Sequence, residues 1–407
     1  MAARDLIDET QPQPAAALEV FLAFLRQGLT AFGGPVAHIG YFRREFVEQR
    51  GWLSEAAFAD LLALCHFLPG PASSQLGMAI GLRRAGLPGM LAAWLGFTLP
   101  AGAAMILFAW LAPTLGHAWG QGWLHGLKIA AAAVVLQALV AMARTLAVGP
   151  VRAGMALGAA AGLVMSGGPV AQICALAAGA AFGAAFLRDL PPAEPLEARP
   201  SDARGLRRGA AAIALFAFLL AALPFLAQVL QSPTLGLASV FYRTGALVFG
   251  GGHVVLPLLE SEIVGRGWLD ADTFLAGYGA AQAVPGPLFS FAGFVGAAQH
   301  VAAGGWVGGL VALVAIFLPS LLLVPGVLPF WQDLRRLPGA RGALAGVNAV
   351  VVGLLAAALW DPALTHAIVR WSDWALLAAA FVFLAVARVP PWVVVLGFAA
   401  ATGLWTA

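Results

Sequence analysis

The sequence contains two copies of one pattern of helix-breaking residues within long apolar segments. Three motifs recur at an offset of 216 or 217 residues: Phe32-Gly33-Gly34 with Phe249-Gly250-Gly251, Gly51-Trp52-Leu53 with Gly267-Trp268-Leu269, and Pro69-Gly70-Pro71 with Pro285-Gly286-Pro287. A constant offset over several motifs indicates an internal duplication. Duplicated halves with Gly/Pro-interrupted apolar segments in matching places are typical of secondary transporters, whose binding sites lie at such breaks.

The composition predicts an all-α polytopic membrane protein. Hydrophobic residues make up 61% of the chain and charged residues 10%, whereas soluble domains carry about 25% charge. Apolar runs over 87–111, 209–230 and 304–330 each reach the ~20 residues that cross a bilayer. The lipid bilayer is therefore an expected partner. The net charge of +3 gives no reason to expect nucleic acid.

The polar segments divide the chain into two repeats. Residues 1–15 lack the apolar core of a signal peptide and are expected to form a disordered tail. Residues 188–208 are charged and rich in proline, so they predict a cytoplasmic linker. The linker separates a first repeat, 16–187, from a single apolar helix at 209–232 and a second repeat, 233–407. That single helix would turn the second repeat upside down if each repeat crosses the membrane an even number of times.

The distribution of charge supports this inversion. In the first repeat the break region is basic, and the matching stretch of the second is acidic: Arg43, Arg44, Arg50, Arg83 and Arg84 against Glu260, Glu262, Asp270 and Asp272. The next loop reverses the bias, because 113–125 holds no Arg or Lys while 333–341 holds three Arg. By the positive-inside rule the repeats have inverted topology, with the N-terminus on the cytoplasmic side.

The segments beside the breaks predict broken or re-entrant helices. Residues 54–68 and 72–84 would form helices of about 20 Å, shorter than the ~30 Å hydrocarbon core. The intervening prolines interrupt the backbone hydrogen bonds. We expect an inverted twin over 273–284 and 288–300. Ser54 and Asp270 are the predicted N-caps of the matching helices.

The breaks predict an anion site. A helix that begins inside the membrane points free N–H groups, with partial positive charge, at whatever lies before it. Glycines allow the backbone to approach a ligand closely. The alternative is that these glycines serve close helix packing. The predicted substrate-binding backbone positions are Phe32, Gly33, Gly34, Pro69, Gly70, Pro71, Gly250, Gly251, Gly252, Pro285, Gly286 and Pro287.

Polar side chains near the breaks complete the predicted site. They are His38, Gln75, Lys128, His253, Gln282 and Asn348. For His38 and His253 the alternative is a capping role beside the Phe-Gly-Gly turns. Lys128 is the only lysine of the chain and aligns with Asn348 in the second repeat. It would face an anion path as a compact charge, or extend its ammonium to the membrane interface.

Acidic residues have a separate interpretation. Asp60 lies within an apolar helix, where a carboxylate is a candidate for proton coupling or pairs with a nearby arginine. Glu45 and Glu262 match between repeats and are expected to form structural ion pairs. Cys65 and Cys174 have no metal-ligand spacing. We expect no metal, cofactor or catalytic residue, and therefore no enzyme.

Longer segments closely resemble the chromate ion transporter (CHR) family, long two-domain type. They are residues 32–41, 51–53, 61–75, 249–253 and 281–287, and the resemblance extends from about Leu18 to Trp405. It implies a multi-pass protein of the cytoplasmic membrane that exports chromate and confers chromate resistance, with sulfate as the similar anion. His66 stands where the family's usual residue is Gln, while Gln282 keeps that residue in the second repeat.

Two alternatives remain beside chromate export. One is an uptake permease for sulfate or a related divalent oxyanion, since size hardly separates sulfate from chromate. Another, from a different class, is an integral-membrane enzyme or receptor, for which the sequence offers no reactive pair of charged residues. A homodimer is the further partner that the sequence leaves open.

Overall fold

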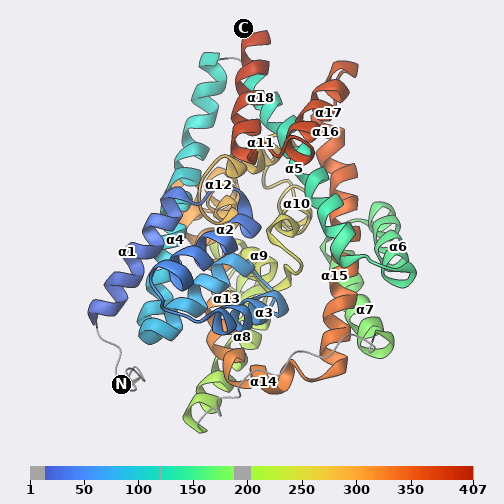
Figure 1. Ribbon diagram of the computed structural model, residues 1–407. Helices are drawn as coiled ribbons and strands as arrows, with labels where there is room; N and C mark the ends of the chain where they lie inside the picture. Colours follow the sequence, from blue (N-terminus) through green and yellow to red (C-terminus); the bar gives the residue numbers. More distant parts are fainter. Residues whose placement is uncertain (1–13, 120–121, 188–202, 407) are drawn as a thin grey trace.

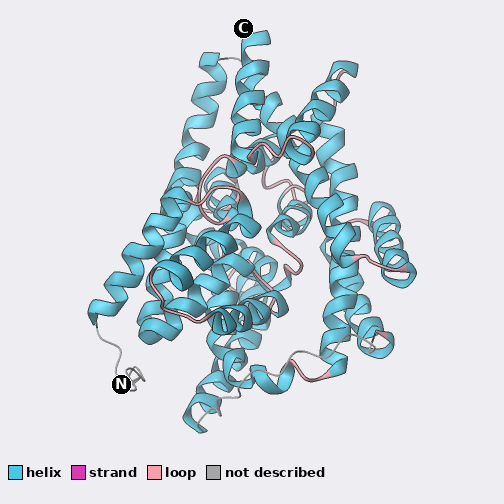
Figure 2. Cartoon of the chain, viewed as in Figure 1, coloured by secondary structure: helices cyan, strands magenta, loops and turns pink. Residues whose placement is uncertain are grey.

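The computed structural model describes residues 14–119, 122–187 and 203–406, which form helices joined by turns and no strand within these ranges (Figures 1 and 2). Residues 1–13 of the predicted tail and 188–202 of the predicted linker lie outside the described residues, and the first helix already includes the last two tail residues, 14 and 15. The helices of the first repeat are α1 (Pro14–Thr30), α2 (Gly34–Arg43), η1 (Arg44–Gln49), α3 (Glu55–Phe67), α4 (Ala72–Trp119), α5 (Gly122–Leu146), α6 (Pro150–Ser166) and α7 (Gly168–Phe186).

The connecting helix α8 (Ala203–Val229) leads into the second repeat. Its helices are α9 (Pro233–Leu247), η2 (Gly252–Val254), α10 (Val255–Ile263), α11 (Ala271–Gln282), η3 (Leu288–Ser290), α12 (Phe291–Ala298), α13 (Gly305–Val327), η4 (Leu328–Phe330), α14 (Trp331–Leu334), α15 (Pro338–Ala358), η5 (Leu359–Leu364), α16 (Thr365–Ala367), α17 (Trp371–Ala385) and α18 (Pro391–Thr406).

The fold is that of an all-α polytopic membrane protein, as predicted. Six helical segments of the described chain are long and apolar enough to cross a membrane, among them α5, α8 and α13. The most apolar window of α8 has no buried residue, so this helix faces outward. The structure starts α8 at Ala203, before the predicted 209. Arginines are good helix formers, and three of them extend the helix beyond its apolar part.

The predicted helix breaks are present. Ser54 Oγ accepts a hydrogen bond from the Ala57 N–H at 3.2 Å, and Asp270 Oδ1 accepts one from the Thr273 N–H at 2.8 Å, which confirms both N-caps. Ala85 and Gly86 have non-helical dihedral angles inside α4. The first part of α4 therefore ends at residue 84, where the sequence predicts a helix end, and the chain folds back on itself.

Each repeat carries the same cluster of charged and aromatic residues beside its first break. A Glu–Arg ion pair measures 2.7 Å in the first repeat and 2.6 Å in the second, and each arginine lies over a tryptophan ring: Glu45–Arg50–Trp52 and Glu262–Arg266–Trp268. Both carboxylates are buried. The predicted structural ion pairing of Glu45 and Glu262 is confirmed.

The two repeats exchange their last helices. The first repeat's α5 packs against α17 and α18 of the second, and the second repeat's α15 packs against α6 and α7 of the first (Figure 1). Glycines permit the close crossing of α7 and α15, because a Cβ on Gly346 would meet the Gly179 carbonyl oxygen. Neither repeat is therefore a separate packing unit.

The breaks of the two repeats are joined by a reciprocal pair of backbone hydrogen bonds. The Gly70 N–H donates to the Val248 carbonyl at 2.6 Å, and the Gly286 N–H donates to the Ala31 carbonyl at 3.0 Å. Ala31 and Val248 are equivalent residues, each just before a Phe-Gly-Gly motif. Each Pro-Gly-Pro turn thus satisfies a carbonyl at the end of a helix in the other repeat. These two hydrogen bonds join the breaks of one repeat to those of the other.

Candidate functional site

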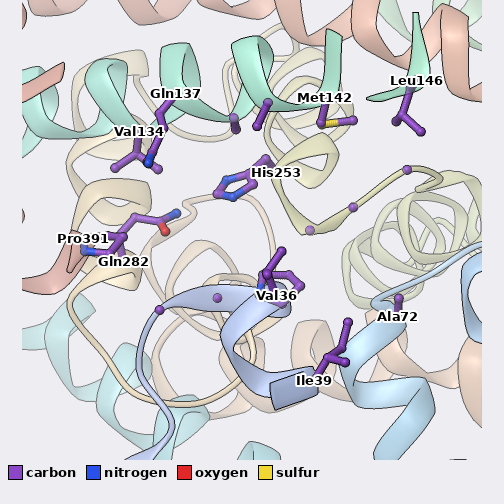
Figure 3. Close-up of a pocket in the computed structure, with 18 of the residues that line it drawn as sticks. Val36, Ile39, Ala72, Val134, Gln137, Met142, Leu146, His253, Gln282 and Pro391 are labelled. Carbon is purple, nitrogen blue, oxygen red and sulfur yellow. The ribbon is translucent and has the colours of Figure 1, made fainter. Parts of the chain in front are cut away.

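A cavity of about 640 Å³ is lined by three of the four breaks, through residues 33–34, 70 and 250–252. One face of α5 forms a side of it, through residues spaced three or four apart, and the start of α2 forms the opposite side (Figure 3). Figure 3 shows the His253 ring between these two sides, with Gln282 and Pro391 toward one end. The α5 residues in the wall are Val134, Gln137, Ala138, Ala141, Met142 and Leu146.

Two helix N-termini, one from each repeat, reach this cavity. The N-cap of α2 is Gly33, with φ +101°, and the N-cap of η2 is Gly251, with φ +142°. Neither cap has a side chain that could accept a hydrogen bond from the first amides. All five glycines of the two motifs, 33, 34 and 250–252, line the cavity. The first N–H groups of α2 and of η2–α10 therefore offer an anion their partial positive charge.

The polar side chains of the wall suit an anion. They are His66, Gln137, His253, Gln282, Asn348 and Arg388, and the described lining residues include no Asp or Glu. A carboxylate would repel a bound anion, whereas imidazole, amide and guanidinium groups can all donate hydrogen bonds to it.

His253 is held by a buried tyrosine. Its Nδ1 lies 2.8 Å from the Tyr278 hydroxyl, and Tyr278 is fully buried. The Gln282 side chain lies beside the same hydroxyl. A Tyr278 hydroxyl that donates to Nδ1 leaves the proton of a neutral imidazole on Nε2. His253 then presents an N–H donor toward the cavity.

Two side-chain amide atoms of the wall are buried and have no well-oriented hydrogen-bond partner among the described residues. They are Gln282 Nε2 and Asn348 Oδ1. A buried polar atom without a partner costs about 1–3 kcal/mol. A bound anion or water molecule in the cavity can accept a hydrogen bond from Gln282 Nε2, whereas Asn348 Oδ1 needs a donor such as water. Gln137, by contrast, uses its Nε2 to donate to the Leu384 carbonyl at 3.2 Å, which ties α5 to the end of α17.

Several predicted site residues lie behind the cavity wall and support the breaks. His38 is 1% exposed, and its ring nitrogens lie 3.2 Å from the Ala31 carbonyl and 3.3 Å from Ser73 Oγ. Gln75 Nε2 donates to the Pro69 carbonyl at 2.6 Å and to Ser320 Oγ at 3.0 Å. The predicted residues that do not line the cavity are Phe32, His38, Pro69, Pro71, Gln75, Lys128, Pro285, Gly286 and Pro287.

Lys128 joins the two repeats through an ion pair. Its Nζ lies 2.9 Å from Asp272 Oδ1, and His366 Nδ1 lies 3.2 Å from the same oxygen. Burial alone would raise the pKa of the Asp272 carboxyl, but the hydrogen bonds and charges of Lys128 and His366 together lower it. The carboxylate is therefore ionised at neutral pH. Lys128 has a carboxylate partner and faces away from the cavity.

Asp60 is also paired outside the cavity. Its Oδ1 accepts hydrogen bonds from Trp331 Nε1 at 2.9 Å and from an Arg335 guanidinium nitrogen at 2.8 Å. Arg335 is buried and belongs to the basic loop of the second repeat. This is the arginine partner that the sequence leaves open as the alternative to proton coupling.

Three polar wall residues, Gln137, Arg388 and His66, are absent from the predicted site. Gln137 is a polar residue within the apolar helix α5, and Arg388 precedes the Val-Pro-Pro stretch before α18. A polar residue inside an apolar segment and a charged residue at a proline break are both usable signals. His66, the departure noted in the sequence, lines the cavity as well.

Known proteins are similar to this chain in sequence over most of its length. The sequence pattern of chromate transporters matches residues 18–184 and 235–404. The chain belongs to the chromate transporter family. A chromate transport protein of Pseudomonas aeruginosa is 32% identical over 380 residues, which cover 88% of this chain and 84% of the relative. One of Cupriavidus metallidurans is 28% identical, covering 84% of this chain and 81% of the relative.

The family extends beyond proteins with an assigned substrate. An uncharacterized transporter of Methanocaldococcus jannaschii is 26% identical, covering 89% of this chain and 87% of the relative. No solved structure is significantly similar to this chain. Membership of the chromate transporter family, together with the apolar helices, makes the chain a multi-pass membrane transport protein.

Proposed function

We propose that this protein exports chromate from the cytoplasm across the inner membrane and thereby confers chromate resistance. The observation that carries the proposal is the cavity in which two uncapped helix N-termini converge and whose described wall has no carboxylate. The names of the Pseudomonas and Cupriavidus relatives point to the same anion. The proposed contacts are Gly33, Gly34, Gly70, His253, Gln282 and Asn348, with the glycines 250–252.

The chemistry of the wall fits a tetrahedral divalent oxyanion. Backbone amides and side-chain N–H groups can replace the hydration of such an anion without a compensating metal. Chromate and sulfate have the same charge and shape, so sulfate is the proposed competitor. Uptake of sulfate or a related oxyanion is the second candidate, and this same wall favours it.

The membrane potential favours export. Moving one charge through 100 mV is worth about 2.3 kcal/mol, so a dianion gains about 4.6 kcal/mol on leaving a cell that is negative inside. That energy supports a gradient of more than ~1000-fold. Uptake would have to overcome the same energy with coupled protons. We therefore propose export. The charge bias of the repeats supports the proposed cytoplasmic N-terminus.

Flux in everted membrane vesicles tests the proposed function. Vesicles with the protein are expected to accumulate chromate faster than vesicles without it, and excess sulfate is expected to slow the accumulation. Flux of sulfate alone would support the second candidate. Absence of protein-dependent flux of either anion would contradict transport of divalent oxyanions.

We also propose a homodimer. The molecular mass of the purified protein in detergent, compared with the mass of one chain, tests it.

The inverted arrangement of the repeats has its own test. The opposite charge bias and the reciprocal hydrogen bonds of Gly70 and Gly286 support it. A reporter tag inserted at Arg84 is expected to be accessible from the cytoplasm, and one at His300 from the opposite side. Accessibility of both tags from one side would exclude the inversion.

Substitution of Asp60 separates proton coupling from ion pairing. Asp60 is the proposed coupling residue if export is coupled, but its bond to Arg335 favours a structural role. Asp60→Asn keeps the shape and removes the charge, so we expect a lower thermal stability and an unchanged pH profile of chromate flux. A pH profile that becomes flat in the variant would assign the coupling role to Asp60.

A further inference from the structure

The turn between α17 and α18 contains an arginine in a backbone conformation that favours glycine. Arg388 has φ +54°. Backbone hydrogen bonds from the Ala387 N–H to the Val382 carbonyl and from the Val389 N–H to the Phe383 carbonyl close the turn around it. At such helix ends glycine is the usual residue, because a Cβ is disfavoured there. The corresponding turn of the first repeat, between α6 and α7, has Gly167 with φ +57°.

The Arg388 side chain lines the cavity. It is the only Arg or Lys among the described lining residues, and no hydrogen-bond or ion-pair partner of its guanidinium occurs in the described ranges. The neighbours of the turn fix its position. Gln137 binds the end of α17, and the Trp392 ring packs on Phe32 at 5.4 Å. The turn therefore lies beside Gly33 and the N-terminus of α2.

The helices of the α17–α18 hairpin are each too short to cross the bilayer, so the turn between them would lie within the depth of the membrane where their outer ends reach its surface. The two helices have 15 and 16 residues, which is about 22–24 Å at 1.5 Å per residue and less than the ~30 Å hydrocarbon core. In Figure 1, α18 runs from the interior of the molecule to the C-terminus at the top. An arginine at such a depth is costly and normally faces a water-filled cavity for a functional reason.

We propose that Arg388 is the specificity-determining residue of the cavity, whose guanidinium binds two oxygens of a tetrahedral dianion beside the amides of α2. This inference rests on the proposed transport of divalent oxyanions. A guanidinium is planar and presents paired N–H donors that match two oxygens of an oxyanion, which an ammonium cannot do. A glycine in this turn would suit the backbone better, so the arginine is explained by its side chain.

Substitution by glycine distinguishes the effect of the backbone conformation from the effect of the Arg388 side chain. Arg388→Gly removes the guanidinium and relieves the backbone. Gln231→Gly is the matched control, because Gln231, in the turn between α8 and α9, is the other described non-glycine residue with positive φ, +46°, and does not line the cavity. Both variants are expected to unfold at the same temperature as the parent or above it.

Transport distinguishes the two variants. Arg388→Gly is expected to raise the chromate concentration for half-maximal flux about tenfold or more, because charge-assisted hydrogen bonds are lost. Gln231→Gly should leave it unchanged, and Arg388→Lys should fall between them since the charge remains without the paired donors. An unchanged half-maximal concentration in Arg388→Gly would overturn the inference.

Binding to the purified protein keeps this inference separate from the proposed function. Sulfate or chromate is expected to raise the unfolding temperature of the parent and of Gln231→Gly, but not that of Arg388→Gly. If the parent shows this stabilisation without any flux, transport fails and recognition by Arg388 stands. If neither anion stabilises the parent, or if both stabilise Arg388→Gly equally well, the inference is overturned.

Discussion

Gly70→Ala is expected to destabilise the protein by about 2–6 kcal/mol and to abolish chromate flux. Gly70 has φ +126°, which disfavours any side chain. Its added Cβ would lie 2.5 Å from Ser320 Oγ and still closer to Gln75 Nε2. Movement of the turn to relieve these contacts would break the Gly70 N–H bond to Val248 that joins the repeats. The unfolding temperature of the detergent-purified variant and its flux in vesicles measure the two effects.

Gly34→Ala is the matched control for backbone strain. Gly34 also has positive φ, +75°, but a Cβ there would have no neighbour within 4 Å. We therefore expect Gly34→Ala to be destabilised by backbone strain alone, about 1–3 kcal/mol. Equal losses of stability in Gly34→Ala and Gly70→Ala would show that the contacts with Gln75 and Ser320 do not explain the glycine at position 70.

Asn348→Asp is expected to lower the efficiency of chromate transport at alkaline pH by about 100-fold or more. The change preserves shape and places a negative charge in a cavity whose described wall has none. Like charges placed side by side in a binding site cost several kcal/mol, and each 1.4 kcal/mol is tenfold in affinity. The introduced carboxyl is charged above its pKa and neutral below it. The loss should therefore be largest at high pH and should diminish as the pH falls.

Gln228→Glu provides the control for this charge. It makes the same kind of replacement in the last turn of α8, at the end of that membrane-crossing helix and away from the cavity. Flux and its pH profile should equal those of the parent. If Asn348→Asp also transports like the parent at alkaline pH, the cavity is not the anion path.

The sequence by itself determined the features that depend on neighbouring residues. Glycine and proline select local backbone angles, so the breaks at 33–34, 69–71 and 250–252 and the helix ends beside them could be predicted without the fold. The N-caps at Ser54 and Asp270 follow from hydrogen bonds that span three residues. The paired glutamates have arginines four or five residues away, which is also a local relation.

Only the tertiary structure decided which side chains face the cavity. Lys128 finds Asp272 across 144 positions, and Asp60 finds Arg335 across 275, so their partners cannot be read from local sequence. Arg388 reaches the cavity because the two repeats exchange their last helices, which places the turn before α18 beside the first repeat's break. Helix propensity and apolar periodicity act over a few turns of one helix, whereas these contacts depend on how distant helices pack against one another.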